Sequence, residues 1–556
     1  MQMSPIQKLL FRFLALSGLA LAAACGGGGS DSSGTPTPPP TGGGGGSGGG
    51  GSSGGPTWTS GVYASASQFK NRCQTVRTGA DILGDPYPDM AGSTLQENFW
   101  LRSWTHETYL WNDEVVDRNP ANYNDRLQYF DLLRTTALTP SGREKDQFHF
   151  SQPTEEYLEQ ITSTPTASYG AEFLAFSVTP PRDIRIAYVD DGTPAAEEIA
   201  GQANFVRGAR ILEIDGIDLV NTNNQSQINS LNDALFPSTA GQMHTFLLQD
   251  PGGAGTRTVM VTSANLAAKA VNHTDVIDTG TGKVGYVHIT TFSPYASEEE
   301  IADAIADMSA QGVTDLVLDL RYNGGGLIAV ASQLGYMVAG AAQTSRKVFE
   351  GFRFNDDAGN SNPVTGGANN PTPFYSTGLG FSVADGTPLA SLNLSRVFIL
   401  STDFTCSASE AVINGLRGVD VEVVLIGGTT CGKPFGFYPE DNCGETYFTI
   451  QFEGVNDKGF GDYADGFTPT NSSSSFGVKI PGCSVSDDFE TELGDETEGM
   501  LAAALQYRTT GSCPAPSSQS LANVTASEAR RVSGEPVGLR PEVNVMRYNR
   551  DMRMPD

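Results

Sequence analysis

Three short segments combine residue types that could carry out nucleophilic chemistry. They read Asp-Leu-Arg-Tyr-Asn-Gly-Gly-Gly at 319–326, Thr-Cys-Ser-Ala-Ser-Glu at 405–410 and Thr-Thr-Cys-Gly-Lys-Pro at 429–434. The first and third follow apolar runs typical of buried strands, and the second follows a strand and a short loop. The first two lead into helical patterns. The sequence therefore places chemistry-bearing residues where core strands end.

The glycine run Gly324–Gly326 has two interpretations. Glycines let the backbone approach a substrate and point N–H groups into a pocket, as an oxyanion hole requires. A glycine-rich turn after a strand can also be purely structural or bind phosphate. The patterns GxGxxG and GxxxxGK[ST] are both absent, which disfavours a nucleotide-phosphate site.

Ser407 and Lys433 are the candidate nucleophile and base. Ser407 begins a predicted helix, where free N–H groups favour negative charge, although a serine there can simply cap the helix with Glu410 completing a capping box. Lys433 follows an apolar strand, where lost hydration lowers the pKa of a lysine and frees its amine as a base. We favour Ser407 over Cys406 because a turn that aims one side chain at a pocket points its neighbour elsewhere. An SxxK pattern is excluded by Glu410.

Composition narrows the range of partners. The chain has 556 residues, 34 Lys and Arg, and 63 Asp and Glu, for a net charge of −29. Such an acidic surface repels phosphate backbones, so we expect no nucleic-acid partner. CxxC and HExxH patterns are absent, and we expect neither a metal nor a cofactor.

The N-terminus has the pattern of an exported protein. The apolar run Phe13–Ala24 has 12 residues, fewer than the roughly 20 needed to span a membrane, so residues 1–25 are predicted to be a secretory signal. The residues before Cys25 resemble the lipobox of bacterial lipoproteins, with Ala22 in place of its usual leucine. The resemblance implies acylation of Cys25, and an ordinary signal peptide is the alternative. Residues 26–56 form a Gly/Ser/Pro tether, and we expect anchoring to a bacterial membrane, at the outer membrane or on the periplasmic side.

Six cysteines remain after Cys25. Export exposes them to oxidising surroundings, where six cysteines allow 15 pairings. We favour Cys431 with Cys443 because a short turn-rich loop separates them, and then Cys483 with Cys513.

Hydrophobic periodicity divides the rest of the chain into four parts. Residues 57–160 are predicted to form a small helical subdomain, 165–265 a β-rich domain, and 266–510 an α/β core with a mainly parallel sheet. The Gly/Asn/Pro-rich insertion at 348–394 is predicted to be a loop or lid, and 511–556 an irregular tail.

Individual elements are predicted from the same patterns. In the β-rich domain we expect strands at 171–178, 184–189, 209–214, 244–248 and 256–261, and helices at 194–200 and 225–235. In the core we expect strands at 284–289, 315–320, 397–400 and 421–426, and helices at 297–310, 327–339, 408–416 and 498–507.

Two resemblances follow from these segments. Residues 165–265 resemble a PDZ domain, and the three chemical segments in this order behind it resemble the C-terminal-processing (tail-specific) serine peptidases. The second resemblance spans roughly residues 95–507. It implies Ser407 as nucleophile, Lys433 as general base, and the N–H groups of Gly325 and Ala408 as oxyanion donors.

The PDZ resemblance implies a peptide site. Tyr169, Gly170 and Ala171 would form the loop that binds a peptide's C-terminal carboxylate, while the peptide adds as a strand to the sheet edge. A β-rich spacer without a ligand is the alternative.

The chain departs from the peptidase family at the group that orients the lysine. Many members have a glutamine four residues after the lysine, where this chain has Phe437; others have an aspartate eleven residues after the serine, where it has Gly418. The third residue stays open among Glu410, Asp420 and Glu440. One branch of the family uses a histidine, for which His149 and His288 lack a matching motif.

We therefore expect a serine endopeptidase that acts by Ser–Lys acyl transfer on exported or envelope proteins, with its PDZ domain capturing substrate C-termini. The alternative is a non-catalytic PDZ scaffold lipoprotein that binds protein C-termini.

Overall fold

The computed structural model describes residues 55–162, 164–253, 255–515, 530–531, 550–552 and 554. They belong to one compact unit that begins at Gly55. The predicted signal peptide, Cys25 and the tether up to residue 54 lie outside the described residues. Within the described part, none of the helices has the length and apolar character needed to cross a bilayer.

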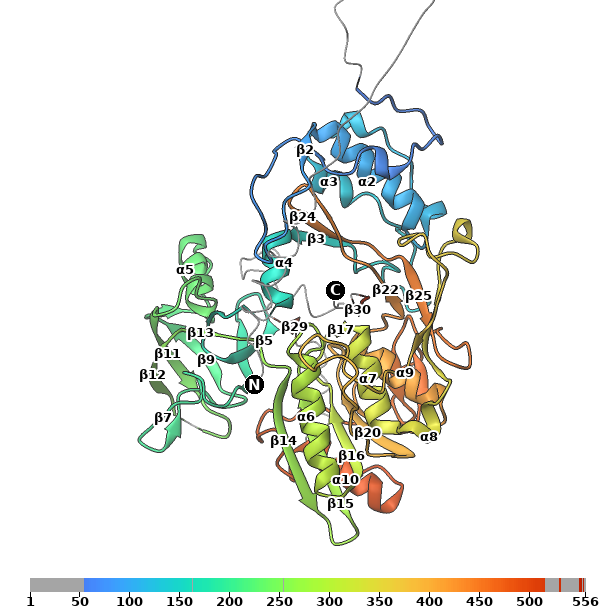
Figure 1. Ribbon diagram of the computed structural model, residues 1–556. Coiled ribbons are helices and arrows are strands. Elements are labelled where there is room, and N and C mark those ends of the chain that lie inside the picture. The colour runs from blue at the N-terminus through green and yellow to red at the C-terminus, as the bar shows by residue number, and fades with distance from the viewer. Residues whose placement is uncertain are drawn as a thin grey trace, which may run out of the picture. The chain divides into compact units, whose positions relative to one another are not determined.

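A six-stranded sheet forms the centre of the core (Figure 1). Its strand order is β14 (Val271–Asp278), β15 (Lys283–Ile289), β16 (Val313–Asp319), β20 (Arg396–Ser401), β21 (Glu422–Gly427) and β28 (Gly482–Ser484). Only β14 pairs antiparallel; the other neighbours are parallel. The predicted mainly parallel sheet is confirmed.

Helices cover both faces of this sheet because side chains alternate between faces along each strand. On one face, residues such as Leu316 and Ile399 pack against α6 (Ser297–Ala310), α7 (Ile328–Ala339) and α9 (Ala408–Gly418). On the other face, Val317 and Phe398 pack against α10 (Gly499–Thr510). Acidic Glu298–Glu300 in the first turn of α6 suit the positive end of its dipole. These four helices confirm the predicted helices within three residues at either end.

The β-rich domain is a second sheet. Its order is β12 (Arg257–Thr262), β11 (Met243–Gln249), β9 (Arg210–Ile214), β6 (Asp183–Val189) and β5 (Ala171–Ser177), with β10 (Ile217–Asp218) beside β9. Helix α5 (Gln225–Leu235) matches its prediction, and Leu231 and Leu235 pack into this sheet's core.

The helix predicted at 194–200 is wrong. Residues 198–203 instead form a hairpin of β7 (Glu198–Ile199) and β8 (Gln202–Ala203). Ala200 and Gly201 both have positive φ, 56° and 83°, which suits a two-residue hairpin turn and ends any helix.

The N-terminal subdomain combines helices with short strands. It comprises α2 (Thr94–Thr108), α3 (Arg126–Phe130) and α4 (Thr154–Ile161), with β1 (Arg72–Cys73), β2 (Met90–Ala91) and β3 (Phe150–Pro153). Strand β3 pairs with β24 (Glu445–Phe448) from the core segment, Phe150 lying opposite Phe448. This pairing fastens the subdomain to the loops that follow Lys433.

The insertion at 348–394 is only partly the loop that was predicted. Its first residues form β18 (Val348–Arg353), which pairs with β19 (Thr372–Pro373) and with β25 (Phe452–Val455). Phe349 and Phe352 are buried, and burial of these rings holds the strand in place.

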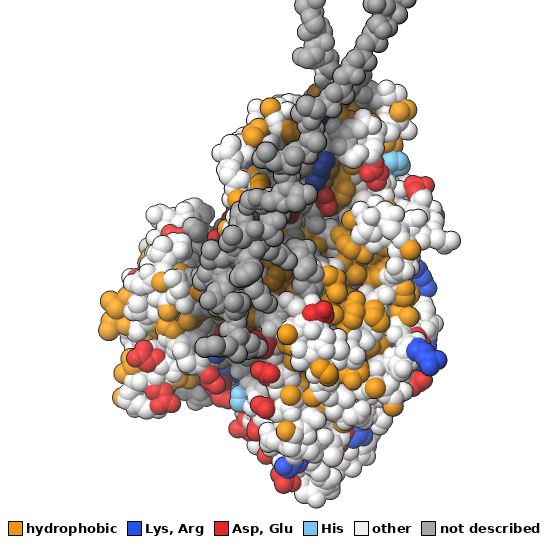
Figure 2. All heavy atoms as spheres, viewed as in Figure 1, with side chains coloured by type: hydrophobic (Ala, Val, Ile, Leu, Met, Phe, Trp, Pro, Cys, Tyr) orange, Lys and Arg blue, Asp and Glu red, His pale blue; other side chains and the backbone are white. Residues whose placement is uncertain are grey.

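The remaining elements are short: β4 (Thr166–Ser168), β13 (Ala264–Leu266), β17 (Gly326–Leu327), α8 (Ala341–Thr344), β22 (Phe435–Gly436), β23 (Glu440–Asn442), β26 (Phe467–Pro469), β27 (Val478–Ile480), β29 (Arg530–Arg531) and β30 (Arg550–Asp551). The last two lie in the tail that was predicted to be irregular. On the face shown in Figure 2, acidic side chains gather at the lower left.

Candidate active site

The glycine run is a turn that only glycine can form. Gly325 and Gly326 have φ of 115° and 136°. A Cβ on Gly326 would lie 2.3 Å from the backbone of Phe292 and Ser293. The Phe292 N–H donates to Gly325 O at 2.8 Å, and Leu327 N–H donates to Phe292 O at 3.1 Å. The run is therefore fixed against the loop after β15.

The turn that contains Ser407, residues 405–410, packs directly against this glycine turn and is called the nucleophile turn below. Asn323 O accepts hydrogen bonds from Cys406 N–H at 3.0 Å and from Ser409 Oγ at 3.1 Å. Thr405 Oγ1 donates to Leu320 O at 2.8 Å. The first and second chemical segments thus meet at the carboxyl ends of β16 and β20.

Ser407 adopts a rare backbone conformation. It is the N-cap of α9, with φ 60° and ψ −111°. Non-glycine residues seldom adopt positive φ, and such strain persists only where neighbours over-determine it. The side chain is fully buried, and its Oγ has no hydrogen-bond partner among the described residues. A buried, unpaired hydroxyl in a strained turn is suited to react.

Glu410 joins the nucleophile turn to the base loop. Its buried carboxylate accepts from the N–H groups of Ser407 at 3.0 Å, Gly432 at 2.9 Å and Lys433 at 2.7 Å, and from the Thr430 hydroxyl. Burial raises the pKa of Glu410, and these hydrogen bonds oppose that rise. The Glu410 half of the predicted capping box is present, with Ser407 N–H donating to the carboxylate, and the same carboxylate also accepts from the loop of Lys433.

A disulfide between Cys406 and Cys431 makes the same connection covalently. The favoured pairing of Cys431 with Cys443 is wrong, since Cys443 bonds Cys73. Sequence proximity misled because the Thr430–Glu410 contact folds Cys431 back onto the nucleophile turn. The pairing of Cys483 with Cys513 is confirmed. As a disulfide sulfur, Cys406 is not available as a thiolate nucleophile.

Lys433 is fully buried between aromatic rings. Its Nζ lies 4.4 Å from the ring centroid of Phe437 and 4.8 Å from that of Phe148. Cation–π attraction therefore acts where the family resemblance led us to expect a glutamine amide. The contribution of Phe148 was missed from the sequence, because tertiary contacts such as the β3–β24 pairing and the hydrogen bond from Arg143 to Cys431 O bring the N-terminal subdomain to this loop.

The other candidates for the third residue lie elsewhere. Asp420 pairs with Lys458, and Glu440 pairs with Lys70. A Cβ on Gly418 would lie 2.9 Å from Asn456 Cβ, so an aspartate does not fit at that position without displacement. Glu410 remains, and its contacts in the site are with three backbone N–H groups and the Thr430 hydroxyl.

Both candidate histidines have structural partners. His149 Nε2 donates to Phe130 O at 2.9 Å, its Nδ1 lies 3.0 Å from the Thr449 hydroxyl, and burial lowers its pKa. His288 Nδ1 lies 3.0 Å from Asn272 Oδ1, and burial lowers the pKa of His288 to about 4. These hydrogen bonds connect neither histidine to Ser407.

The two oxyanion candidates differ in their surroundings. Ala408 is the first residue of α9, so its N–H has no acceptor within the helix. Gly325 N–H donates to Asn323 Oδ1 at 2.8 Å. It becomes available to a substrate only if the Asn323 amide turns away.

The candidate peptide loop is rigid. Tyr169 is buried and its hydroxyl donates to Ala234 O at 2.8 Å. Gly170 has φ 79°, and its N–H donates to Ser168 Oγ at 3.0 Å. Ala171 begins β5 opposite Val189. The loop leads into the strand at the edge of the domain's own sheet.

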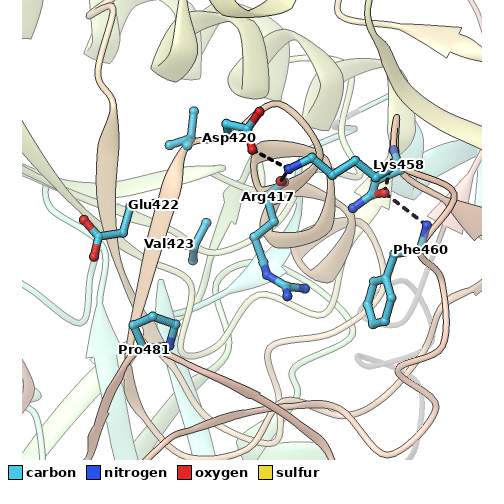
Figure 3. A pocket seen from close by; sticks show the side chains of 9 residues that line it. Arg417, Asp420, Glu422, Val423, Lys458, Phe460 and Pro481 are labelled. Carbon is cyan, nitrogen blue, oxygen red and sulfur yellow. Dashed lines mark hydrogen bonds and ion pairs between the residues drawn. The ribbon is translucent and has the colours of Figure 1, made fainter.

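A surface cavity of about 480 Å³ lies away from this chemistry (Figure 3). Its lining includes Arg417, Asp420 and Lys458, near the C-terminal end of α9. Ser407 begins the same helix, ten residues or about 15 Å from Arg417. The cavity is not the site of the proposed nucleophile.

Part of the chain is similar in sequence to known peptidases. Residues 283–437 match the profile of Peptidase family S41. A stretch of 126 residues is 32% identical to the carboxyl-terminal-processing protease of Picosynechococcus sp., and it spans 22% of this chain and 28% of that relative.

One solved structure with a TM-score above 0.5 has a similar fold. A Bacteroides fragilis protein described as an S41 protease has a TM-score of 0.55 at 23% identity, over 77% of this chain and 98% of that one. A photosystem II D1 C-terminal processing protease has a TM-score of 0.41 at 18% identity, over 74% and 97%. Residues 283–437, which contain Ser407, Lys433 and the glycine run, thus match the profile of peptidase family S41, while the curated relative is matched over 28% of its own length.

Proposed function

We propose that this chain is a serine endopeptidase of the C-terminal-processing type, acting by Ser–Lys acyl transfer on exported or envelope proteins. The observation that carries the proposal is the double connection between the nucleophile turn and the base loop, through the Glu410 carboxylate and the Cys406–Cys431 disulfide. Peptide binding alone does not require that a strained serine with an unpaired hydroxyl be connected to a buried lysine.

In the proposed reaction, the Lys433 amine takes the proton of Ser407 as Oγ attacks a peptide carbonyl. Ala408 N–H at the start of α9, with Gly325 N–H once Asn323 releases it, stabilises the oxyanion. The protonated lysine then gives its proton to the leaving amine. Water next hydrolyses the acyl-enzyme and frees Ser407.

Substrate capture is assigned to the β-rich domain, which we propose to be a PDZ domain. Strand β5 follows the Tyr169–Ala171 loop and is the last strand that residues 165–265 contribute to their sheet, an arrangement that suits addition of a substrate C-terminus as a further strand in place of β29.

Substituting the two proposed catalytic residues tests the reaction. Ser407→Ala and Lys433→Ala should each lower kcat on an unfolded protein with an apolar C-terminus by at least 1,000-fold, because each removes an obligatory partner in acyl transfer. Lys458→Ala removes an exposed lysine and serves as the matched control.

Labelling distinguishes the peptidase from the scaffold. A fluorophosphonate should modify Ser407 in the native chain, and the adduct is located by peptide mass spectrometry. Full activity in either alanine variant, or no adduct on Ser407, would rule out the proposed chemistry.

We also propose that Cys25 carries the lipid anchor. The support is the small-residue run before Cys25 and the Gly/Ser/Pro tether after it. Cys25→Ser should move the protein from the membrane to the soluble fraction of a bacterial envelope preparation. Unchanged membrane recovery would contradict the assignment.

A further inference from the structure

Two short strands of the C-terminal tail pair with two strands of the same chain, β29 with the end of a sheet and β30 with β17 (Figure 1). Strand β29 pairs antiparallel with β5, Arg530 lying opposite Ala175. Strand β30 pairs parallel with β17, Arg550 lying opposite Gly326. Both partner strands belong to parts of the molecule that the proposed function assigns to peptide handling.

The first edge is the proposed capture strand. Strand β5 pairs with β6 on one side, and β29 occupies its other side. An unpaired strand edge presents N–H and C=O groups that bind extended peptides, which is how peptide ligands add to such domains. Strand β29 of the tail therefore occupies the side of β5 that the proposed function assigns to a captured substrate.

The second partner strand, β17, is at the proposed reaction centre and forms a two-stranded sheet with β30. Strand β17 begins at Gly326, the last residue of the glycine run. Strand β30 also neighbours β22, which starts two residues after Lys433. Beyond β30, Met552 packs against the hydrophobic core around the parallel sheet, whereas Met554 is 46% exposed. The tail thus runs beside both the glycine run and the base loop.

Length and charge suit a tethered ligand. Eighteen residues separate β29 from β30 in sequence, enough for roughly 60 Å when extended, so one tail can bind both partner strands. The residues after Ala515 contain six arginines and five acidic residues, in a chain with 63 acidic and 34 basic residues overall. A slightly basic segment on an acidic protein is attracted to it.

We propose that strands β29 and β30 of the tail, together with Met552, act as a tethered peptide ligand of the chain's own proposed substrate-binding strands, held on β5 and on β17. The tail keeps the site latent until a substrate C-terminus displaces it. Tethering gives the tail a millimolar effective concentration, so it competes with peptides added in solution. This inference rests on the proposed peptidase function for its meaning, and the docking itself is testable without catalysis.

The binding test uses the full-length chain carrying Ser407→Ala, so that no turnover interferes. The probe is a fluorescent peptide with the sequence of residues 547–556. Asp551→Pro removes a backbone N–H from β30, and Met552→Glu places a charge where an apolar side chain packs. Each should tighten the Kd of the probe at least tenfold by vacating the site. Met554→Glu changes an exposed methionine and should leave the Kd unchanged.

The activity test uses the same substitutions with Ser407 intact. Asp551→Pro and Met552→Glu should raise kcat/KM on an unfolded substrate several-fold, with Met554→Glu equal to the native chain. The inference would be overturned if the Kd of the probe were the same in the native tail and in every variant that keeps the native melting temperature. If the Kd of the probe shifts but no variant cleaves the substrate, docking of the tail stands and the proposed peptidase function is wrong. Ser407-dependent loss of the tail from the native chain, seen by intact mass, would make the tail a substrate and overturn latency.

Discussion

At the scale of single residues, the site depends on strain and desolvation. Ser407 holds a positive φ, which costs of order 1–3 kcal/mol, and hydrogen bonds from its own turn to Asn323 and Glu410 maintain it. Lys433 is buried without the glutamine that the resemblance implied, and Phe437 takes that place with its ring. An aromatic face can hold an ammonium in position as an amide oxygen does, but without accepting a hydrogen bond.

Phe437 is therefore expected to be a positioning residue. Phe437→Ala should lower kcat about tenfold with KM changed less than twofold, since the ring stabilises the ammonium that forms when Lys433 takes the Ser407 proton, a contact worth about 1–2 kcal/mol when desolvated. Phe437→Gln should recover most of kcat by supplying an amide oxygen. Phe448→Ala, in the same aromatic cluster, controls for lost packing. Steady-state kinetics decides, and equal kcat for Phe437→Ala and the native chain would refute the role.

At the scale of elements, two loops that follow parallel strands are connected to each other. The loop after β20 presents Ser407 and the loop after β21 presents Lys433, and both Glu410 and the Cys406–Cys431 disulfide connect them. A single carboxylate satisfying several buried donors is costly to remove, because each donor left unpaired costs about 1–3 kcal/mol.

Removal of that disulfide should affect catalysis as well as stability. A double Cys406→Ala and Cys431→Ala variant should lose about 3 kcal/mol of unfolding free energy, as expected for a 25-residue loop, and kcat should fall at least tenfold. The Cys483–Cys513 bridge spans a similar 30 residues outside the site, so its double alanine variant should lose comparable stability while keeping kcat. Urea titrations and kinetics of both variants provide the comparison. Equal effects on kcat would argue against a positioning role.

At the scale of the whole molecule, a buried charge network connects the β-rich domain to the core. Arg207 and Arg321 each donate to Asp487 at 2.7 Å, and Arg207 also donates to the Tyr322 hydroxyl at 2.8 Å. Burial raises the pKa of Asp487, but the two guanidinium charges outweigh it and the pKa lies below its usual value. Tyr322 directly precedes the Asn323 that supports the nucleophile turn, so the domain contact and the site share one loop.

His288 lies in the same region and should make the free energy of unfolding decrease in mild acid. Burial, with Arg321 and Arg207 adding to it, lowers the pKa of His288 from 6.5 to about 4. Between these values the unfolded chain binds a proton that the folded chain does not, so stability falls as pH drops through this window. The loss between pH 7.5 and 5 should be about 2 kcal/mol.

His288→Gln removes this titration and keeps a donor for Asn272. Urea unfolding at both pH values should show that the variant loses about 2 kcal/mol less than the native chain over the same interval. An identical loss in both proteins would show that His288 does not control the acid response.

Local patterns in the sequence were enough to determine the main elements and the chemical segments. Helix α6, the parallel strands and the strand-to-helix position of Ser407 follow from hydrophobic periodicity and turn residues, which act over a few neighbours. Only the tertiary structure decided the pairing of Cys406 with Cys431, the place of Phe148 beside Lys433, the role of Glu410 between two loops, and the docking of the tail on β5 and β17. Each of these depends on contacts between residues far apart in the chain, and local periodicity carries no information about which distant loops meet.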